Sequence, residues 1–218
     1  MVEKRIRSMG KIIFDNFYNE KNLKIKNVNL SPIRMSKKIN KLTQKEVEYL
    51  IDNEYIFSLL KKRKNYIVYE CDPINLVSQY RYDVFVKYFY VESYINNKNL
   101  ELAKKIYLNH IKAFNNFSEP DGKKNTSKEF LNAFNSLISS ILINGFKDSI
   151  IPISKTGIPI DGAHRLAISL YLKNKVNFVV FDLLDGKYDR DFFESRGFDK
   201  EYLKIIDKIY FKIVGGSK

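Results

Sequence analysis

A run of five residues, Asp161-Gly162-Ala163-His164-Arg165, holds the side chains best suited to chemistry in this sequence. It lies where short apolar runs give way to helical spacing, so a helix is predicted to begin at Ala163. The first N–H groups of a helix have no partner within it, and the helix dipole adds partial positive charge there. Gly162 gives a ligand access to this backbone, Arg165 can bind two phosphate oxygens, and His164 can donate a further hydrogen bond. The pattern predicts an anion site at a helix N-terminus.

A simpler role for the same residues is open at this point. Asp161 fits the position of a helix-capping residue, with Arg165 pairing with it at the surface. The strands and the helix on either side of this run determine how its side chains are exposed. Strands are predicted at Ile150–Ile153 and Ile158–Ile160 before it and at Val176–Phe181 after the helix.

A helix is also predicted immediately upstream. Thr126 and Glu129 have the spacing of a capping box, the apolar stripe continues to Ile143, and Gly145 is typical of a helix end. The aromatic residues of 78–117 recur at helical intervals and are expected mostly in the core. The remaining elements expected are an edge strand at 27–33, a helix of about five turns from Thr43 to Lys64, a strand at 66–70 and a helix over 202–210.

The composition excludes several classes of protein. The chain has 218 residues of which 44% are hydrophobic, enough for a substantial core. No apolar run approaches the roughly 20 residues of a membrane span, and the apolar stretch near the start is too short for a signal peptide. Cys71 is the one cysteine, so an internal disulfide is excluded and no metal cluster is predicted. A cytoplasmic protein is expected.

The charge balance leaves two interpretations open. The formal net charge is +13, which favours anionic partners such as nucleic acid, nucleotides or phosphosugars. The lysines are scattered along the chain, however, which is also typical of a composition bias. His110 has no partner residues at metal-ligand spacing and is expected to be structural. Arg81, Asp83 and Lys87 have spacings suited to ion pairing, the last two within one helix.

Several motifs occur in a fixed order before the helix start. Ser140-Ile141, Gly145 and Pro152-Ile153 precede Gly162-Ala163-His164-Arg165. Together they resemble the nucleotide-binding core shared by the ParB-like and sulfiredoxin proteins, over residues 126–182.

The resemblance implies an α+β fold. A helix-rich, aromatic N-terminal part would be followed by a small mixed sheet with flanking helices. The implied parts are 1–117, a helical region that could bind an acceptor, 118–182, the nucleotide-binding core, and 183–218, a helical tail packing on that core.

The resemblance also implies the site residues. Ser136 and Ser140, one helical turn apart, would contribute hydroxyls to a nucleotide phosphate site. The basic residue expected one turn earlier is replaced by Ala133, for which Lys128 or Lys124 could substitute. The backbone and side chains implied to hold ATP or ADP, with Mg²⁺, are those of Gly162, Ala163, His164 and Arg165.

Departures from the family pattern select among its members. Ala163 stands where sulfiredoxin has its reacting cysteine, so reductase chemistry has no nucleophile. About 35 residues follow Asp182, too few for the DNA-reading helix-turn-helix of the chromosome-partitioning members. The chain is most similar to the free-standing kinases of the fold, which phosphorylate small hydroxyl compounds.

The expected function is therefore phosphoryl transfer from a nucleotide to a sugar or amino acid, as in surface-polysaccharide biosynthesis. Asp161 is the preferred catalytic base, with Asp83 and Asp148 as alternatives, and His164 is the second catalytic candidate. One rival is a nucleotide- or nucleic-acid-binding protein without turnover. The other is a scaffold that binds no nucleotide.

Overall fold

The computed structural model describes residues 31–51, 53–58, 64–119, 122–146, 149–183 and 185–215. In chain order its elements are α2 (Ser31–Arg34), β1 (Lys37–Thr43), α3 (Gln44–Ile51), α4 (Glu54–Ser58), β2 (Asn65–Cys71), the 3₁₀ helix η1 (Pro73–Leu76), α5 (Asp83–Asn96), α6 (Leu100–Asn115), α7 (Ser127–Asn144), β3 (Ile150–Ser154), α8 (Ala163–Leu172), β4 (Val176–Phe181), α9 (Arg190–Ser195) and α10 (Lys200–Gly215).

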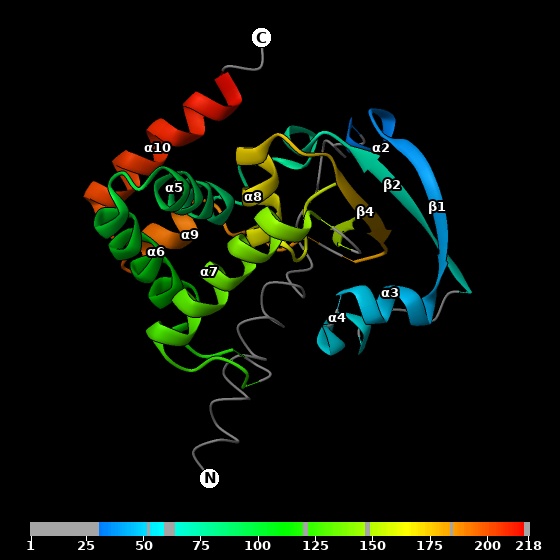
Figure 1. The fold of residues 1–218 in the computed structure, drawn as a ribbon, viewed down its shortest axis with the longest axis horizontal. Coiled ribbons are helices and arrows are strands. Elements are labelled where there is room, and N and C mark those ends of the chain that lie inside the picture. Colours follow the sequence, from blue (N-terminus) through cyan, green and yellow to red (C-terminus); the bar gives the residue numbers. More distant parts are fainter. Residues whose placement is uncertain are drawn as a thin grey trace.

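The architecture is α+β, a small mixed sheet with helices around it. Figure 1 shows α5, α6, α9 and α10 on one side of the molecule and the sheet with α3 and α4 on the other, with α7 and α8 between them. Among the helices that the structure describes, none has the length and apolar character needed to cross a membrane.

The sheet has four strands in the order β1-β2-β4-β3. β1 and β2 are antiparallel, as are β2 and β4, whereas β3 and β4 are parallel and joined through α8. Residues 37–71 and 150–181 therefore contribute to one sheet, which crosses the boundary predicted at residue 117. The parallel pair matters most here, because α8, whose start holds the candidate site residues, connects its two strands.

The aromatic segment forms the core of the helical side, as predicted. Tyr90 and Tyr107 are fully buried and lie about 5 Å apart between ring centroids, and Phe134 of α7 packs against both. A second cluster joins α8 to the sheet, where Leu166 and Ala167 pack with Phe178. These two layers fix α8 from both sides.

The prediction of one continuous helix from Thr43 to Lys64 was wrong. The capping box at its start is present, since the Glu46 carboxylate accepts from the Thr43 N–H at 2.7 Å. α3 nevertheless ends at Ile51, and a new helix, α4, begins at Glu54. Asn53 explains the new start, because its Oδ1 accepts from the Ile56 N–H at 3.2 Å. Residues 59–63 lie outside the described part.

The prediction of an edge strand at 27–33 was also wrong for residues 31–33, the part of it that the structure describes. Ser31–Arg34 is the short helix α2, which tolerates Pro32 in its first turn. The edge strand is instead β1, Lys37–Thr43, whose side chains are almost all exposed on both faces. Residues 27–30 lie outside the described part.

Other predicted elements are confirmed. α7 begins after Thr126 with a complete capping box to Glu129 and ends at Gly145, and β4 has the predicted bounds. The strand expected at Ile158–Ile160 is reduced to one bridge between Ile153 and Pro159. The helix expected in the tail is α10, preceded by α9, which the pattern did not predict.

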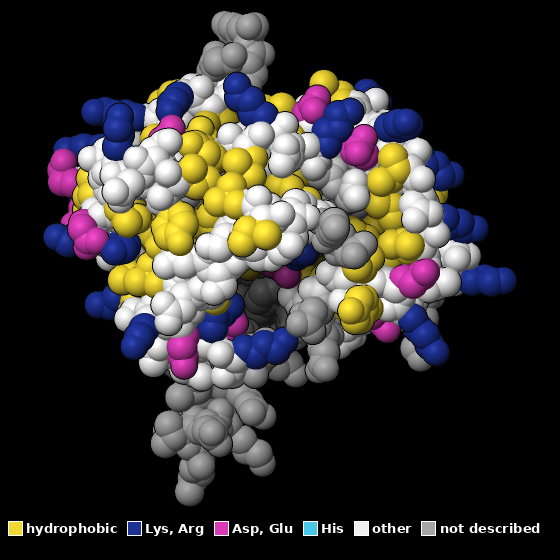
Figure 2. Space-filling view, in the orientation of Figure 1, with side chains coloured by type: hydrophobic (Ala, Val, Ile, Leu, Met, Phe, Trp, Pro, Cys, Tyr) yellow, Lys and Arg dark blue, Asp and Glu magenta, His cyan; other side chains and the backbone are white. Residues whose placement is uncertain are grey.

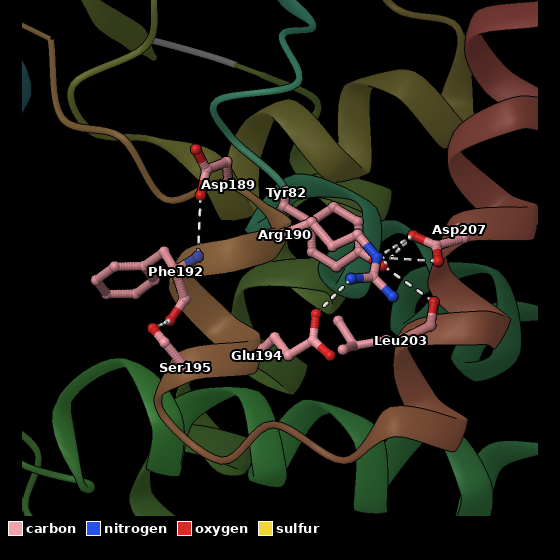
Figure 3. A network of polar contacts seen from close by, with 8 residues as sticks. All are labelled: Tyr82, Asp189, Arg190, Phe192, Glu194, Ser195, Leu203 and Asp207. Atoms are coloured by element: carbon pink, nitrogen blue, oxygen red, sulfur yellow. Dashed lines mark hydrogen bonds and ion pairs between the residues drawn. The ribbon is translucent and has the colours of Figure 1, made fainter.

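A polar network holds the C-terminal helices against the start of α5 (Figure 3). Tyr82 Oη donates to Asp207 Oδ1 at 2.8 Å and to the Leu203 carbonyl at 3.0 Å. Arg190 Nε contacts both carboxylate oxygens of Asp207, and its Nη1 contacts Glu194 at 2.6 Å. Because Tyr82 lies between Arg81 and Asp83 in the chain, this network also fixes the backbone that carries the buried ion pairs described below.

Candidate functional site

The predicted run lies beside the first residues of β3, because the chain folds back along that strand before α8 begins. The chain leaves β3 at Ser154, turns at Gly157, and returns so that Ile160 N donates to the Pro152 carbonyl at 2.8 Å. It then enters α8 at Ala163. The turn therefore brings Asp161 and the helix start back alongside β3, where Gly162 lies next to Ile151.

The N-terminus of α8 has no side-chain cap. Gly162 is the N-cap residue, with φ 81° and ψ 17°, a left-handed conformation that favours glycine. Its carbonyl accepts from Leu166 N at 2.9 Å. Within the part of the chain that the structure describes, the N–H groups of Ala163, His164 and Arg165 have no acceptor. These are the donors that an anion at a helix start would use.

The space beside the Gly162 Cα is already occupied. A Cβ at this position would lie 3.3 Å from Ile151 Cγ1 and 3.5 Å from Arg165 Nη2. The glycine is therefore explained by its backbone conformation and by this close packing. A ligand at the helix start would have to approach from the side of the N–H groups.

Asp161 is held at this helix start by two hydrogen bonds. Its Oδ1 accepts from Gly162 N at 2.6 Å, and its Oδ2 accepts from Asn53 Nδ2 at 3.2 Å. The Asn53 amide thus links the start of α4 to the Asp161 carboxylate. Asn53 was not predicted from the sequence, because the two residues are far apart in the chain. The carboxylate is half-buried and has a fixed orientation.

His164 points into the aromatic core of the helical side. Its Nε2 lies 3.0 Å from Tyr107 Oη, and its ring packs edge-on against Phe134 at 4.4 Å between centroids. Burial, followed by the charge of Lys87, holds the pKa of His164 well below its ordinary value. The imidazole is therefore neutral at pH 7. With Nε2 engaged by Tyr107, only Nδ1 remains for a ligand.

Arg165 lies beside Gly162, half-buried, and contacts no acid among the described residues. Its side chain lines a small cavity of about 30 Å³, enough for about one water molecule. The other residues that line this cavity are Phe146, Ser149, Ile151, Ser169, Lys175, Val176 and Asn177. A guanidinium without an ion-pair partner next to uncapped N–H groups is suited to anion binding.

The structure does not connect the two predicted serines of α7 to this helix start. Ser136 and Ser140 are exposed, on the side opposite the buried residues Phe134 and Ile138. Among the described residues, the one hydrogen bond of the Ser140 side chain is donated by Asn144 Nδ2 to Ser140 Oγ at 3.5 Å. Their phosphate role stays a prediction. Asp148, an alternative base, lies outside the described residues.

A buried ionic triad lies on the helical side of the turn. The Asp83 carboxylate accepts from Arg81 Nε at 2.9 Å and from Lys87 Nζ at 2.7 Å, and the second of these contacts confirms the predicted intrahelical pair. All three residues are at most 5% exposed. Arg81 Nη1 also donates to the Pro159 carbonyl, which connects the triad to the turn before Asp161. The sequence predicted the Asp83–Lys87 pair but not the burial of the triad.

The charges of the triad act on the helix start. Burial alone would raise the pKa of Asp83, but Arg81 and Lys87 hold it well below its ordinary value. Burial lowers the pKa of Lys87, an effect that Asp83 and also Asp161 oppose. Two cations therefore share one carboxylate close to Asp161. A further anion beside them would be electrostatically favoured.

A second buried polar cluster lies where β3 and β4 end. The hydroxyls of Ser154 and Thr156 are 2.8 Å apart, and both donate to Asp185 Oδ1. The Ile158 N–H donates to Ser154 Oγ at 3.2 Å, so the cluster shapes the same turn. Apart from this cluster, Figure 2 shows a hollow between the helical side and the sheet side, with acidic and basic side chains at its edge.

The two histidines make stability sensitive to pH. His110 is 1% exposed, and neither ring nitrogen has a partner among the described residues. Burial lowers the pKa of His110 well below its ordinary value, as it does for His164. The unfolded chain takes up these protons below about pH 6.5 while the folded chain does not, so stability is lost as pH falls through that value.

We expect the free energy of unfolding to decrease by up to about 1.4 kcal/mol per pH unit for each histidine below that point. Urea unfolding between pH 7.5 and 5 measures the slope. His110→Phe should reduce it by half, because the aromatic ring fits between Phe193 and Phe114 without taking up a proton. An unchanged slope in that variant contradicts the assignment.

Comparison with known proteins gives no relative: no family model, no curated protein and no solved structure matches this chain. The resemblance to the ParB-like and sulfiredoxin proteins therefore stays a prediction from the motif order.

Proposed function

We propose that this chain is a nucleotide-dependent phosphotransferase that transfers a phosphoryl group from ATP or ADP to the hydroxyl of a small metabolite, such as a sugar or an amino acid. The proposal is carried by the uncapped start of α8, with the Arg165 guanidinium beside it and the Asp161 carboxylate held at the same place. The parallel β3-α8-β4 unit also supports a ParB-like core, because it contains the predicted Pro152-Ile153 and Gly162–Arg165 motifs in order.

The phosphates would bind to the free N–H groups at the start of α8 and to the Arg165 guanidinium. Phosphoryl transfer depends mainly on positioning and on neutralising charge, which these groups and the nearby Lys87 provide. When Tyr107 donates to Nε2 of His164, the neutral ring carries its proton on Nδ1. That proton can form one more hydrogen bond to a phosphate oxygen. His164 is then a binding and positioning group and not a charged acid.

Asp161 would accept the proton of the acceptor hydroxyl. A general base has to be fixed within hydrogen-bond reach of that hydroxyl, and the bonds from Asn53 and Gly162 fix the carboxylate. Asp83 is the weaker candidate, because both its oxygens are engaged by Arg81 and Lys87 in the core.

The residues fit a Mg²⁺ ion that arrives with the nucleotide. Mg²⁺ is commonly held by one or two carboxylates together with phosphate oxygens, and Asp161 is the nearest carboxylate to the helix start. Among the described residues there is no group of three or more His, Cys, Asp or Glu that could hold a metal by itself. Bound to the nucleotide, Mg²⁺ would neutralise charge on the transferred group.

Asp161→Asn separates turnover from binding. We expect the variant to bind nucleotide as the wild type does but to transfer phosphate at least about 100-fold more slowly, because the general base is removed. The assay follows ADP or AMP release from ATP or ADP with pooled sugars and amino acids as acceptors. Asp182→Asn is the matched control, since Asp182 is exposed and pairs with Lys155 at the end of β4. Equal transfer rates in the wild type and in Asp161→Asn would show that Asp161 is not the general base. Nucleotide binding without any transfer in the wild type would mean that the protein binds nucleotides but is not a phosphotransferase.

A further inference from the structure

The basic residues are not spread evenly over the surface. Residues 34–45, which include β1, contain five basic residues and no acidic one. β1 is a terminal strand of the sheet, and Lys37, Lys38 and Lys41 on it are exposed. Lys45 continues the line at the start of α3. Figure 2 shows basic side chains along the side of the molecule where β1 lies.

Four exposed lysines follow one another along this edge without an acidic partner in the described part of the chain. Within the described residues, no ion pair involves Lys37, Lys38, Lys41 or Lys45. Glu46, the next acid along the chain, is engaged by Thr43. The lysines that do form ion pairs lie elsewhere, namely Lys87, Lys104, Lys124, Lys155, Lys175, Lys204 and Lys212. The positive charge on the β1 edge is therefore available to a partner.

An exposed aromatic side chain continues the line of lysines. Tyr49 lies one helical turn after Lys45 on α3, so the two share a face, and it is 84% exposed. Unpaired bases stack on such rings, whereas duplex bases have no free faces. The most exposed aliphatic side chain, Ile143, lies on α7 and away from this edge. A line of cations ending at an aromatic ring fits a single strand better than it fits a flat membrane.

We propose that the β1 edge, defined as Lys37, Lys38, Lys41, Lys45 and Tyr49, binds single-stranded nucleic acid without sequence preference. The lysines contact phosphates and Tyr49 stacks on a base. This surface is separate from the start of α8, so the inference does not rest on the proposed phosphotransferase activity.

Fluorescence anisotropy with a labelled 20-nucleotide oligo-dT and oligo-U, across a series of salt concentrations, tests the proposal. Changing Lys37, Lys38, Lys41 and Lys45 together to Gln should weaken binding and reduce the salt slope by about 0.7 for each phosphate that is no longer neutralised. Tyr49→Ala should weaken binding about tenfold with little change in the slope. Arg165→Ala should leave oligonucleotide binding unchanged.

The matched control removes the same charge elsewhere. Lys98, Lys105, Lys128 and Lys208 are exposed lysines outside this edge with no ion pair among the described residues, and changing them to Gln should affect binding much less. Edge lysines also prevent strand-to-strand aggregation, so a second variant, in which Lys37, Lys38, Lys41 and Lys45 are all changed to Glu, keeps the edge charged while reversing its sign. It should stay monomeric and bind no oligonucleotide.

Three results overturn the proposal. The first is an equal loss of affinity in both quadruple variants, which means that binding follows net charge alone. The second is retention of binding by the charge-reversed variant. The third is binding to vesicles containing phosphatidylserine but not to oligonucleotides, an outcome worth testing because Met35 and Ile39 are apolar and exposed on the same stretch.

Discussion

Replacing Asp83 by Asn is expected to lower the free energy of unfolding by about 3–5 kcal/mol, because the buried cations Arg81 and Lys87 would lose the carboxylate that both contact. Both cations are at most 5% exposed, so water cannot take over the role of the carboxylate. Urea unfolding at pH 7 measures the change. Arg81 also anchors the turn before α8 through the Pro159 carbonyl, so ligand binding at the helix start should weaken with the fold.

Lys87→Met provides the matched control. It removes one cation, keeps a side chain of similar length and leaves the Arg81–Asp83 pair intact, so stability should change little. If Lys87 contributes to the electrostatic field at the helix start, the variant should nevertheless bind phosphate ligands more weakly. A loss of stability in Lys87→Met as large as in Asp83→Asn would contradict the role assigned to Asp83 as the shared partner of both cations.

The same carboxylate gives a pH signature separate from that of the histidines. The pKa of Asp83 is lowered in the folded state, so its contribution to stability is present above its ordinary pKa of about 3.9 and is lost as pH falls below that value. The stability difference between wild type and Asp83→Asn should therefore shrink in acid. A difference that stays constant from pH 7 to pH 3 would mean that the Asp83 charge is not the cause.

Local elements could be predicted from the sequence because their signals are local. The capping box at Thr126 and the apolar run Val176–Phe181 set the bounds of α7 and β4 to within a residue. β1 was missed because both its faces are polar and carry no alternation. The break between α3 and α4 was missed because it depends on the Asn53 side chain capping a new helix.

The site was predicted in outline for the same reason. The position of Gly162 as N-cap and the helix start at Ala163 could be predicted from the residues next to them in the sequence. The partners that decide what each side chain can do come from distant parts of the chain. Tyr107 engages His164, and Asn53 orients Asp161. Such contacts depend on how the two sides of the molecule pack, which no spacing in a single sequence reveals.

Arg165→Ala is expected to abolish the stabilisation of the protein by nucleotides. A ligand present at about 100 times its dissociation constant stabilises the folded state by about 2.7 kcal/mol. The guanidinium beside Gly162 has no acidic partner among the described residues, so its removal should cost binding and not folding. Arg34→Ala, which removes an exposed arginine of α2, is the matched control.

Thermal unfolding with ATP, ADP, CTP and GTP, each with and without Mg²⁺, is the most direct measurement on wild type, Arg165→Ala and Arg34→Ala. If the start of α8 binds nucleotide phosphates, at least one nucleotide stabilises the wild type and Arg34→Ala but not Arg165→Ala. Stabilisation of all three proteins alike, or of none by any nucleotide, would contradict phosphate binding at this helix start.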